Sequence, residues 1–245
     1  MRFSVCIPTL NEERYLPILL NALAVQTHKD FSVTVADGDS EDKTIETAGQ
    51  FFKKLNLKIL QSPQRGVSFQ RNYAAKRSQS EHLIFFDADV RLEPQFLEKL
   101  NNYLTKHPAD ALTCWNIPIS GNLWDKIIFW IYNVFFLSAL QKIYPAAAIG
   151  TFIYIRKNIF ERLRGFDEAM KYGEDSELVF RAHKAGYKFS ALRDPVIQFS
   201  IRRIKKEGRL KFYAKTISWG AYYYIFGKWP QKAQSGVKHE FGKHV

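Results

Sequence analysis

Two acidic motifs are the best candidates for chemistry in this sequence. The first is Asp87-Ala88-Asp89, which directly follows the apolar run Leu83-Ile84-Phe85-Phe86. A buried strand that ends in two carboxylates brings negative charge to the rim of a sheet, where a divalent cation can neutralise it. The second is Glu174-Asp175-Ser176-Glu177, which leads into a helical pattern. Carboxylates in such a cluster can exchange protons with a substrate, although acidic residues also occur at helix N-termini for structural reasons.

Short apolar segments alternate with helical patterns over the first hundred residues. Strands are expected at about 3–7, 31–36, 57–60 and 83–86, and helices at about 12–26, 41–55, 70–76 and 94–107. This alternation predicts an α/β fold with a parallel sheet that is covered on both faces. Ligands of such sheets bind at the carboxyl ends of the strands. Polar residues follow the first, second and fourth strands, namely Thr9, Asn11, Glu12, Asp37, Asp39, Asp87 and Asp89.

Length and composition favour one compact catalytic domain with appendages. The chain has 245 residues, of which 46% are hydrophobic, enough to bury a substantial core. The two cysteines, Cys6 and Cys114, stand in apolar surroundings and are expected to be buried and reduced. The first residues read as a strand and not as a secretory leader, so a cytoplasmic location is expected.

The positive charge lies mainly near the C-terminus. Net charge is +12, and residues 196–245 carry 11 Lys and Arg against 2 Asp and Glu, whereas residues 1–195 carry 25 against 22. A basic segment rich in aromatic residues is suited to phosphates, nucleic acid or an anionic membrane surface. Within it, the aromatic residues and lysines of 211–232 favour a peripheral membrane contact.

A second apolar segment lies at 127–140. Only Asn133 and Ser138 in it are neither aliphatic nor aromatic. It is too short to cross a bilayer, which needs about 20 residues. Two interpretations stay open, a buried core helix and a helix that lies in a membrane interface.

Several motifs follow one another in an order that resembles a known family. They are Pro8-Thr9-Leu10-Asn11-Glu12, Asp37-Gly38-Asp39-Ser40-Glu41-Asp42-Lys43-Thr44, Gly66-Val67-Ser68-Phe69-Gln70-Arg71-Asn72, Asp87-Ala88-Asp89, and Gly165-Phe166-Asp167-Glu168 before Glu174-Asp175-Ser176-Glu177-Leu178. This set resembles family 2 glycosyltransferases with the GT-A fold. The resemblance implies a single Rossmann-like domain over 1–195, with a mostly parallel central sheet flanked by helices. Residues 1–107 would be its nucleotide-binding half and 108–195 its acceptor-binding half, and 196–245 would form a basic, aromatic-rich helical extension.

The resemblance also implies the reaction and the roles of individual residues. The family transfers a sugar with inversion from a nucleotide-diphosphate sugar to a hydroxyl or lipid-phosphate acceptor. Asp87 and Asp89 would hold Mn²⁺ or Mg²⁺, which stabilises the departing diphosphate. Asp175, with Glu174 beside it, would be the general base that takes the acceptor's proton. The expected nucleotide-sugar site comprises Pro8, Thr9, Asn11, Glu12, Asp37, Asp39, Gly66, Arg71, Asp87, Ala88, Arg202 and Arg203.

Several alternatives stay open at this point. Asp37 and Asp39 can instead shape a turn before a helix. Asp87-Ala88-Asp89-Val90 also fits a haloacid-dehalogenase-like phosphatase with Asp87 as nucleophile, but three strand–helix units precede it here and that family begins with this strand. A basic module that binds nucleic acid is a third hypothesis. The acceptor is expected to be a glycan or a lipid-linked molecule, with the enzyme at the inner face of the cell membrane, and His239 is a weak candidate metal ligand.

Overall fold

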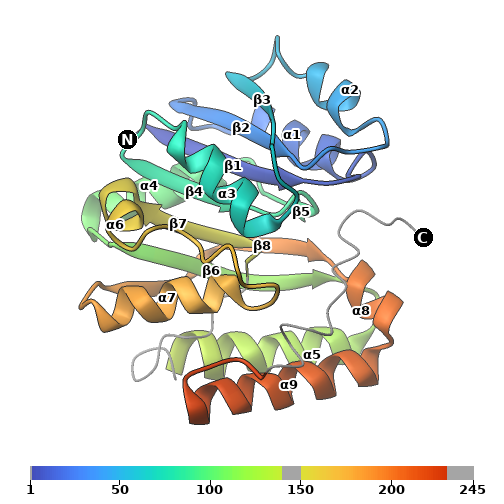
Figure 1. Cartoon of the computed structure of the whole chain (residues 1–245), viewed down its shortest axis with the longest axis vertical. Coiled ribbons are helices and arrows are strands. Elements are labelled where there is room, and N and C mark those ends of the chain that lie inside the picture. Colours follow the sequence, from blue (N-terminus) through green and yellow to red (C-terminus); the bar gives the residue numbers. More distant parts are fainter. Residues whose placement is uncertain (1, 140–149, 231–245) are drawn as a thin grey trace.

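The computed structural model describes residues 2–139 and 150–230. Its centre is one eight-stranded sheet in the order β3-β2-β1-β4-β7-β6-β8-β5, with helices on both faces (Figure 1). The strands are β1 (Phe3–Thr9), β2 (Phe31–Asp37), β3 (Leu57–Gln61), β4 (His82–Phe86), β5 (Val90–Arg91), β6 (Ala111–Ile119), β7 (Phe152–Arg156) and β8 (Phe189–Ser200). The helices are α1 (Leu16–Ala24), α2 (Thr44–Gly49), α3 (Val67–Lys76), α4 (Phe96–Lys106), α5 (Leu123–Ile131), the π-helix η1 (Tyr132–Ala139), α6 (Lys157–Arg162), α7 (Glu174–Lys184), α8 (Arg202–Glu207) and α9 (Arg209–Phe226).

The N-terminal half of the sheet is parallel, as the sequence predicts. Strands β3, β2, β1 and β4 run in one direction, and their pairing sets Thr9 beside Asp37 and Asp37 beside Gln61. The carboxyl ends of these strands therefore form one edge, which is where ligands of parallel sheets bind. The second half makes the sheet mixed, because β7 is antiparallel to both β4 and β6. Strand β8 is parallel to β6 and runs across residue 195, the expected boundary of the extension.

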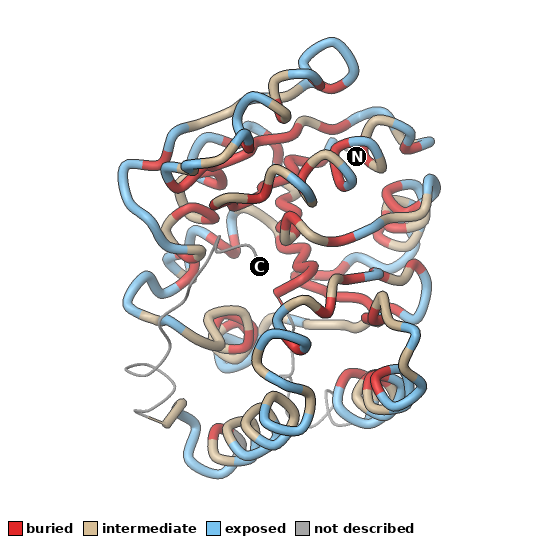
Figure 2. Tube along the Cα trace, turned by 90° about the vertical axis from the view of Figure 1, so that its right-hand side faces the viewer, coloured by how far each residue is buried: buried red, intermediate tan, exposed pale blue. Residues whose placement is uncertain are grey.

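Alternation along the central strands divides the core into two layers. Val5 and Ile7 of β1 pack with α1, α4 and α5 on one face, and Cys6 packs with α3, α6 and α7 on the other. Figure 2 shows this pattern as buried residues along the central strands and exposed ones on the outer turns of the helices. Both cysteines are buried and free, as expected.

The structure shortens two expected helices. The helix expected at 12–26 begins at Leu16, and the one expected at 41–55 is α2, which ends at Gly49. The cause lies in the loops after β1 and β2, where the Glu12 backbone N–H donates to Thr44 Oγ1 at 2.7 Å. Backbone groups near these positions are committed to contacts between the two loops, so the helices start later.

The apolar segment at 127–140 lies on α5 and η1 as far as Ala139, and residue 140 lies outside the described residues. Helix α5 begins after Asn122, whose side chain accepts a hydrogen bond from the Trp124 backbone N–H. No helix in the described part of the chain is long and apolar enough to cross a membrane.

Candidate active site

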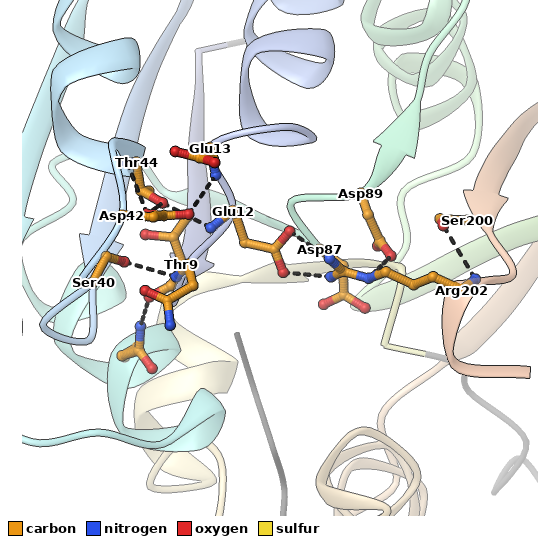
Figure 3. A network of polar contacts seen from close by, with 12 residues as sticks. Thr9, Glu12, Glu13, Ser40, Asp42, Thr44, Asp87, Asp89, Ser200 and Arg202 are labelled. Carbon is orange, nitrogen blue, oxygen red and sulfur yellow. Dashed lines mark hydrogen bonds and ion pairs between the residues drawn. The ribbon is translucent and has the colours of Figure 1, made fainter. Parts of the chain in front are cut away.

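The loops after β1 and β2 interlock at the carboxyl edge of the sheet. Asn11, at a φ of 53°, donates its backbone N–H to Ser40 Oγ at 2.9 Å. Its side-chain Oδ1 accepts from the Glu41 backbone N–H at 2.7 Å, and Asp42 accepts from the Glu13 backbone N–H at 3.1 Å. These reciprocal bonds hold both loops in one arrangement, part of which is drawn in Figure 3.

Asp37 is fully buried at the end of β2 and organises this loop pair. Its carboxylate accepts from Thr9 Oγ1 at 3.0 Å, from Ser40 Oγ at 2.5 Å and from the Ser40 backbone N–H at 2.8 Å. These contacts are the turn-shaping role that the sequence left open, and they leave less of the carboxylate for a ligand. Pro8, the last residue but one of β1, is paired with Ala36 of β2 and is buried.

Asp39 points outward beside an open depression. Its side chain is 67% exposed and pairs with Arg65 at 3.3 Å. The depression has a volume of about 440 Å³ and is lined by Asp39, Gln61, Ser62 and Pro63. It lies at the carboxyl ends of β2 and β3, and Gly66 follows it along the chain.

Gln70 of α3 holds the carboxyl edge of the parallel strands in place. It was not among the residues predicted for the site. Its buried amide donates to the carbonyl oxygens of Thr9 and Ala36, both at 2.7 Å, and accepts from the Gly66 backbone N–H at 3.3 Å. A Cβ at Gly38 would lie 3.1 Å from this amide. A lone glutamine in a helical segment gives no signal of this role in a single sequence.

Arg71 brings the two acidic motifs together. Its side chain is 1% exposed and forms ion pairs with Asp87 at 2.6 Å and Glu174 at 3.1 Å, while donating to the Gly150 carbonyl at 3.0 Å. Sequence reasoning expected it to point toward a nucleotide. In the structure its guanidinium faces Asp87, directly after β4, and Glu174 of α7, two carboxylates that are 87 positions apart in the sequence.

Asp175 lies in the first turn of α7, directly after Gly173 and Glu174. Its Oδ1 accepts from the Ser176 backbone N–H at 2.7 Å. Burial raises the pKa of Asp175 to about 7, and the charge of Glu174 adds to the rise while Arg71 opposes it. A carboxyl group with a pKa near 7 can gain and lose a proton under physiological conditions, which is what a general base needs.

Asp89 and Glu12 share a second arginine, Arg202, as Figure 3 shows. Arg202 donates to both carboxylate oxygens of Glu12, one of them at 2.8 Å, and its Nε lies 3.1 Å from Asp89 Oδ2. Its guanidinium stacks 4.5 Å above the ring of Tyr15. Burial raises the pKa of Asp89 to about 7, although Arg202 opposes the rise. Burial also raises the pKa of Asp87, against the charge of Arg71.

The other expected residues differ in how close they come to this cluster. Ala88 is buried between Asp87 and Asp89. Arg203 is exposed and pairs with Glu207 at 3.0 Å, with its guanidinium 5.7 Å from the ring of Tyr172, so the structure does not bring it to the carboxylates. His239 lies outside the described residues.

The carboxylates fit part of a divalent-cation site. Mg²⁺ and similar ions are commonly held by one or two protein carboxylates together with substrate phosphates. Asp87 and Asp89 supply such a pair, although Arg71 and Arg202 engage them. Within residues 2–139 and 150–230, no cluster of three or more His, Cys, Asp or Glu side chains is placed to hold a metal ion. A cation here would have to share its coordination with a substrate.

Aromatic residues from distant elements surround the N-terminus of α7. Tyr172 makes edge-to-face contacts with Trp219 of α9 and with Trp229, at centroid distances of 4.9 and 5.1 Å. Burial raises the pKa of Tyr132 of η1 well above its ordinary value, and the charge of Asp175 raises it further. These rings were not among the predicted site residues, because their proximity depends on contacts between segments far apart in sequence.

A mixed sheet with carboxylates at the carboxyl edge of its parallel half, facing the N-terminus of α7, is the arrangement expected of the GT-A fold. The model of the family described as Glycosyl transferase family 2 matches residues 4–164. The chain belongs to this family, and the sequence-based assignment is confirmed. Membership of this family argues against the haloacid-dehalogenase-like phosphatase that the sequence left open.

Relatives with known names support the same class. The chain is 28% identical over 211 residues to the poly(ribitol-phosphate) beta-N-acetylglucosaminyltransferase TarS of Staphylococcus aureus, covering 83% of this chain and 36% of TarS. It thus spans about a third of the length of that relative. It is also 28% identical over 200 residues to glycosyltransferase AglE of Haloferax volcanii, covering 79% of this chain and 65% of AglE.

Solved structures agree with the fold. The crystal structure of S. aureus TarS 1-349 in complex with UDP superposes with a TM-score of 0.65 at 27% identity, covering 82% of this chain and 60% of that one. The mannosyltransferase PcManGT from Pyrobaculum calidifontis, solved in complex with GDP-Man and Mn²⁺, gives a TM-score of 0.69 at 21% identity, covering 94% of this chain and 66% of that one. The predicted GT-A architecture is therefore confirmed.

Proposed function

We propose that this chain transfers a sugar, with inversion, from a nucleotide-diphosphate sugar to an acceptor hydroxyl or lipid phosphate, and that Asp175 is the general base. The observation that carries the proposal is the joining of two acidic motifs through Arg71, with a carboxyl group of raised pKa beside them. The complex of TarS with UDP supports a uridine nucleotide as the first donor to test.

The reaction is a single displacement. The acceptor oxygen forms a bond to the anomeric carbon as the bond from that carbon to the diphosphate oxygen breaks, and the bonding electron pair leaves with the diphosphate. Asp175 accepts the proton of an acceptor hydroxyl as the new bond forms. With a lipid-phosphate acceptor, which is already anionic, Asp175 would contribute less.

The donor site is proposed at the carboxyl edge of β1, β2 and β4. The depression beside Asp39 is suited to the nucleoside. The planar guanidinium of Arg202, which pairs with Glu12 in the free protein, is of a kind suited to phosphate oxygens. Asp87 and Asp89 would hold Mn²⁺ or Mg²⁺ there. When bound, such an ion supplies charge neutralisation for the departing diphosphate.

The acceptor is proposed to be a glycan or lipid-linked molecule at the inner surface of the cell membrane. Two features support this location, the basic C-terminal segment and the exposed apolar side chains of α5 and α9.

Calorimetry and thermal unfolding with UDP, in the presence and absence of Mn²⁺, test the donor site. A ligand at about 100 times its Kd stabilises the native state by about 2.7 kcal/mol, which is a rise of roughly 5–10 °C in a chain of this size. Asp89→Asn should remove the effect of Mn²⁺ on UDP affinity, and Asp37→Asn should weaken UDP binding with or without metal. Asp30→Asn, an exposed change just before the opposite end of β2, is the matched control. If UDP, GDP, CDP and dTDP all fail to bind with either metal, the donor assignment is wrong.

A further inference from the structure

Exposed apolar side chains are concentrated at one end of the molecule. Of the sixteen large hydrophobic side chains that are exposed in the described part of the chain, eleven lie on α5, η1 and α9. Figure 1 places these elements together at the end opposite β3 and α2. Helices α5 and α9 are joined near their N-termini, because the buried carboxylate of Asp125 in α5 accepts from Tyr213 Oη at 2.8 Å and from Arg209 Nε at 3.1 Å.

Three polar side chains of the α5–η1 segment point into the protein, which is not expected of a surface that contacts only water. Apart from Lys126, which is exposed, the side chains of Asp125, Asn133 and Ser138 are turned inward: Asn133 bonds to the backbone of Asn116 at 2.9 and 3.0 Å, and Ser138 accepts from Trp115 Nε1 at 3.1 Å. Meanwhile Trp124 and Trp130 are 69% and 57% exposed. A surface helix in water normally shows the reverse pattern.

The exposed apolar residues form stripes and not scattered points. Leu123, Ile127 and Trp130 recur at helical spacing on α5, and Leu210, Ile217 and Ile225 do so on α9, where each of the three is at least 66% exposed. A contiguous apolar face of this kind marks a contact with a partner or a membrane.

Charge distinguishes a membrane from other apolar partners. Segments 123–139 and 202–228 contain only two acidic residues, Asp125 and Glu207, and both are held in ion pairs. Lys126, Lys211 and Lys228 are exposed on the same segments. Aromatic side chains beside lysines, without free carboxylates, are typical of helices that lie in the interface of an anionic bilayer.

Elements of the apolar end also lie beside the N-terminus of α7, which carries the candidate base Asp175. Trp219 of α9 contacts Tyr172, three positions before Asp175, at a ring-centroid distance of 4.9 Å. The charge of Asp175 also contributes to the raised pKa of Tyr132 of η1. The apolar end of the molecule is therefore continuous with the acceptor side of the site, whereas the donor site lies at the edge of β1 and β2.

We propose that α5, η1 and α9 form a docking face that lies in the headgroup region of an anionic lipid bilayer, and that a lipid-linked acceptor reaches Asp175 from this face. The second part rests on the proposed function. The first part stands on the exposed stripes, the inward polar groups and the charge.

Flotation of the full chain with vesicles tests the docking face. Binding is expected with equimolar phosphatidylcholine and phosphatidylglycerol, and far less with phosphatidylcholine alone. Each lysine near an anionic surface contributes about fivefold, the equivalent of about 1 kcal/mol, so Lys211→Glu with Lys228→Glu should weaken binding at least about 25-fold. Trp124→Glu with Trp130→Glu should abolish it. Matched controls at other places are Lys53→Glu with Lys58→Glu and Val25→Glu with Phe52→Glu, which should bind as wild type.

Two further measurements distinguish bilayer docking from other uses of this face. Photo-crosslinking from vesicles that contain a diazirine-labelled phosphatidylglycerol should label peptides of α5 and α9 and none of α2. Light scattering without lipid should show the same mass for wild type and Trp124→Glu with Trp130→Glu; a wild-type dimer that this variant dissociates would overturn the proposal in favour of self-association.

Nucleotide binding separates this inference from the proposed function. All of these variants should keep wild-type affinity for UDP with Mn²⁺ and a wild-type circular dichroism spectrum. Absence of vesicle binding by a chain that binds UDP would overturn the docking face and leave the donor site intact. Vesicle binding through the same residues by a chain that binds no nucleotide diphosphate would support the face and refute its link to an acceptor.

Discussion

Replacing Arg71 with methionine removes the only cation that contacts both Asp87 and Glu174 among the described residues. The guanidinium is almost completely buried and satisfies two carboxylates and one carbonyl. Removing one partner of a buried ion pair leaves an uncompensated charge and typically costs about 3–5 kcal/mol. The lower end applies here, because the Asp87 side chain is 35% exposed and can regain water.

A loss of about 3 kcal/mol should lower the midpoint of thermal unfolding by roughly 6–12 °C in a chain of this size. The matched control is Arg65→Met. Arg65 also bridges two carboxylates, Asp39 at 3.3 Å and Glu41 at 3.1 Å, but it is 51% exposed. Its removal should leave the midpoint almost unchanged, because water screens surface ion pairs.

The pH dependence of this difference checks its cause. Burial raises the pKa of Asp87 and of Asp175, and Arg71 opposes both shifts, so the pKa of each should rise further in Arg71→Met. A carboxyl group whose folded-state pKa lies above its unfolded value stabilises the fold at low pH and loses that contribution as the pH rises through the folded pKa. The difference in thermal unfolding midpoint between Arg71→Met and wild type should therefore be larger at pH 8 than at pH 5.5. Equal midpoints for Arg71→Met and Arg65→Met, or a gap that does not change with pH, would refute the reasoning.

Two other predictions concern α7. Asp175→Asn should lower turnover by about 10²–10⁴-fold with little change in UDP affinity, whereas the control Asp167→Asn should not. Because burial raises the pKa of Asp175 to about 7, wild-type turnover should rise with pH up to about 7 and then level off. A flat pH profile, or near-normal turnover of Asp175→Asn, would exclude Asp175 as the base. In Gly173→Ala the new Cβ would lie 2.2 Å from the ring of Trp229, whereas in Gly186→Ala it would meet nothing within 4 Å, and both glycines have positive φ. Tryptophan fluorescence should therefore change in Gly173→Ala and not in Gly186→Ala, and identical spectra would mean that Trp229 does not pack on Gly173.

The parallel half of the fold was predictable because its strands are short, apolar and punctuated by helices. Periodicity located β1 to β4, and the rule that ligands meet the carboxyl ends of parallel strands brought Thr9, Asp37 and Asp87 to one edge. Strands β6 and β8 were not predicted. Each contains a proline, Pro118 or Pro195, which interrupts the pattern by which a strand is recognised.

The partners of the site arginines could not be predicted in the same way. Arg202 and Glu12 are 190 positions apart, and Arg71 and Glu174 are 103 apart. Which carboxylate an arginine meets depends on how the β4–β7 and β6–β8 pairings close the second half of the sheet. Sequence patterns record the type of residue at each position, whereas these contacts are set by long-range packing.

Charge balance connects the proposed donor and acceptor sides of the site. Five carboxylates, those of Glu12, Asp87, Asp89, Glu174 and Asp175, contact or lie beside the guanidinium groups of Arg71 and Arg202. Burial raises the pKa of Asp89 and of Asp175 to about 7, so the two groups are poised alike in the free protein. A diphosphate would add negative charge and raise both pKa values further unless a cation accompanied it. A divalent ion beside Asp89 would favour the ionised form of that group most strongly, because it is nearest, and would leave Asp175 as the carboxyl group that titrates near neutral pH. Two carboxyl groups that start with similar pKa values would thus be separated into a metal ligand and a base by the binding of the donor itself.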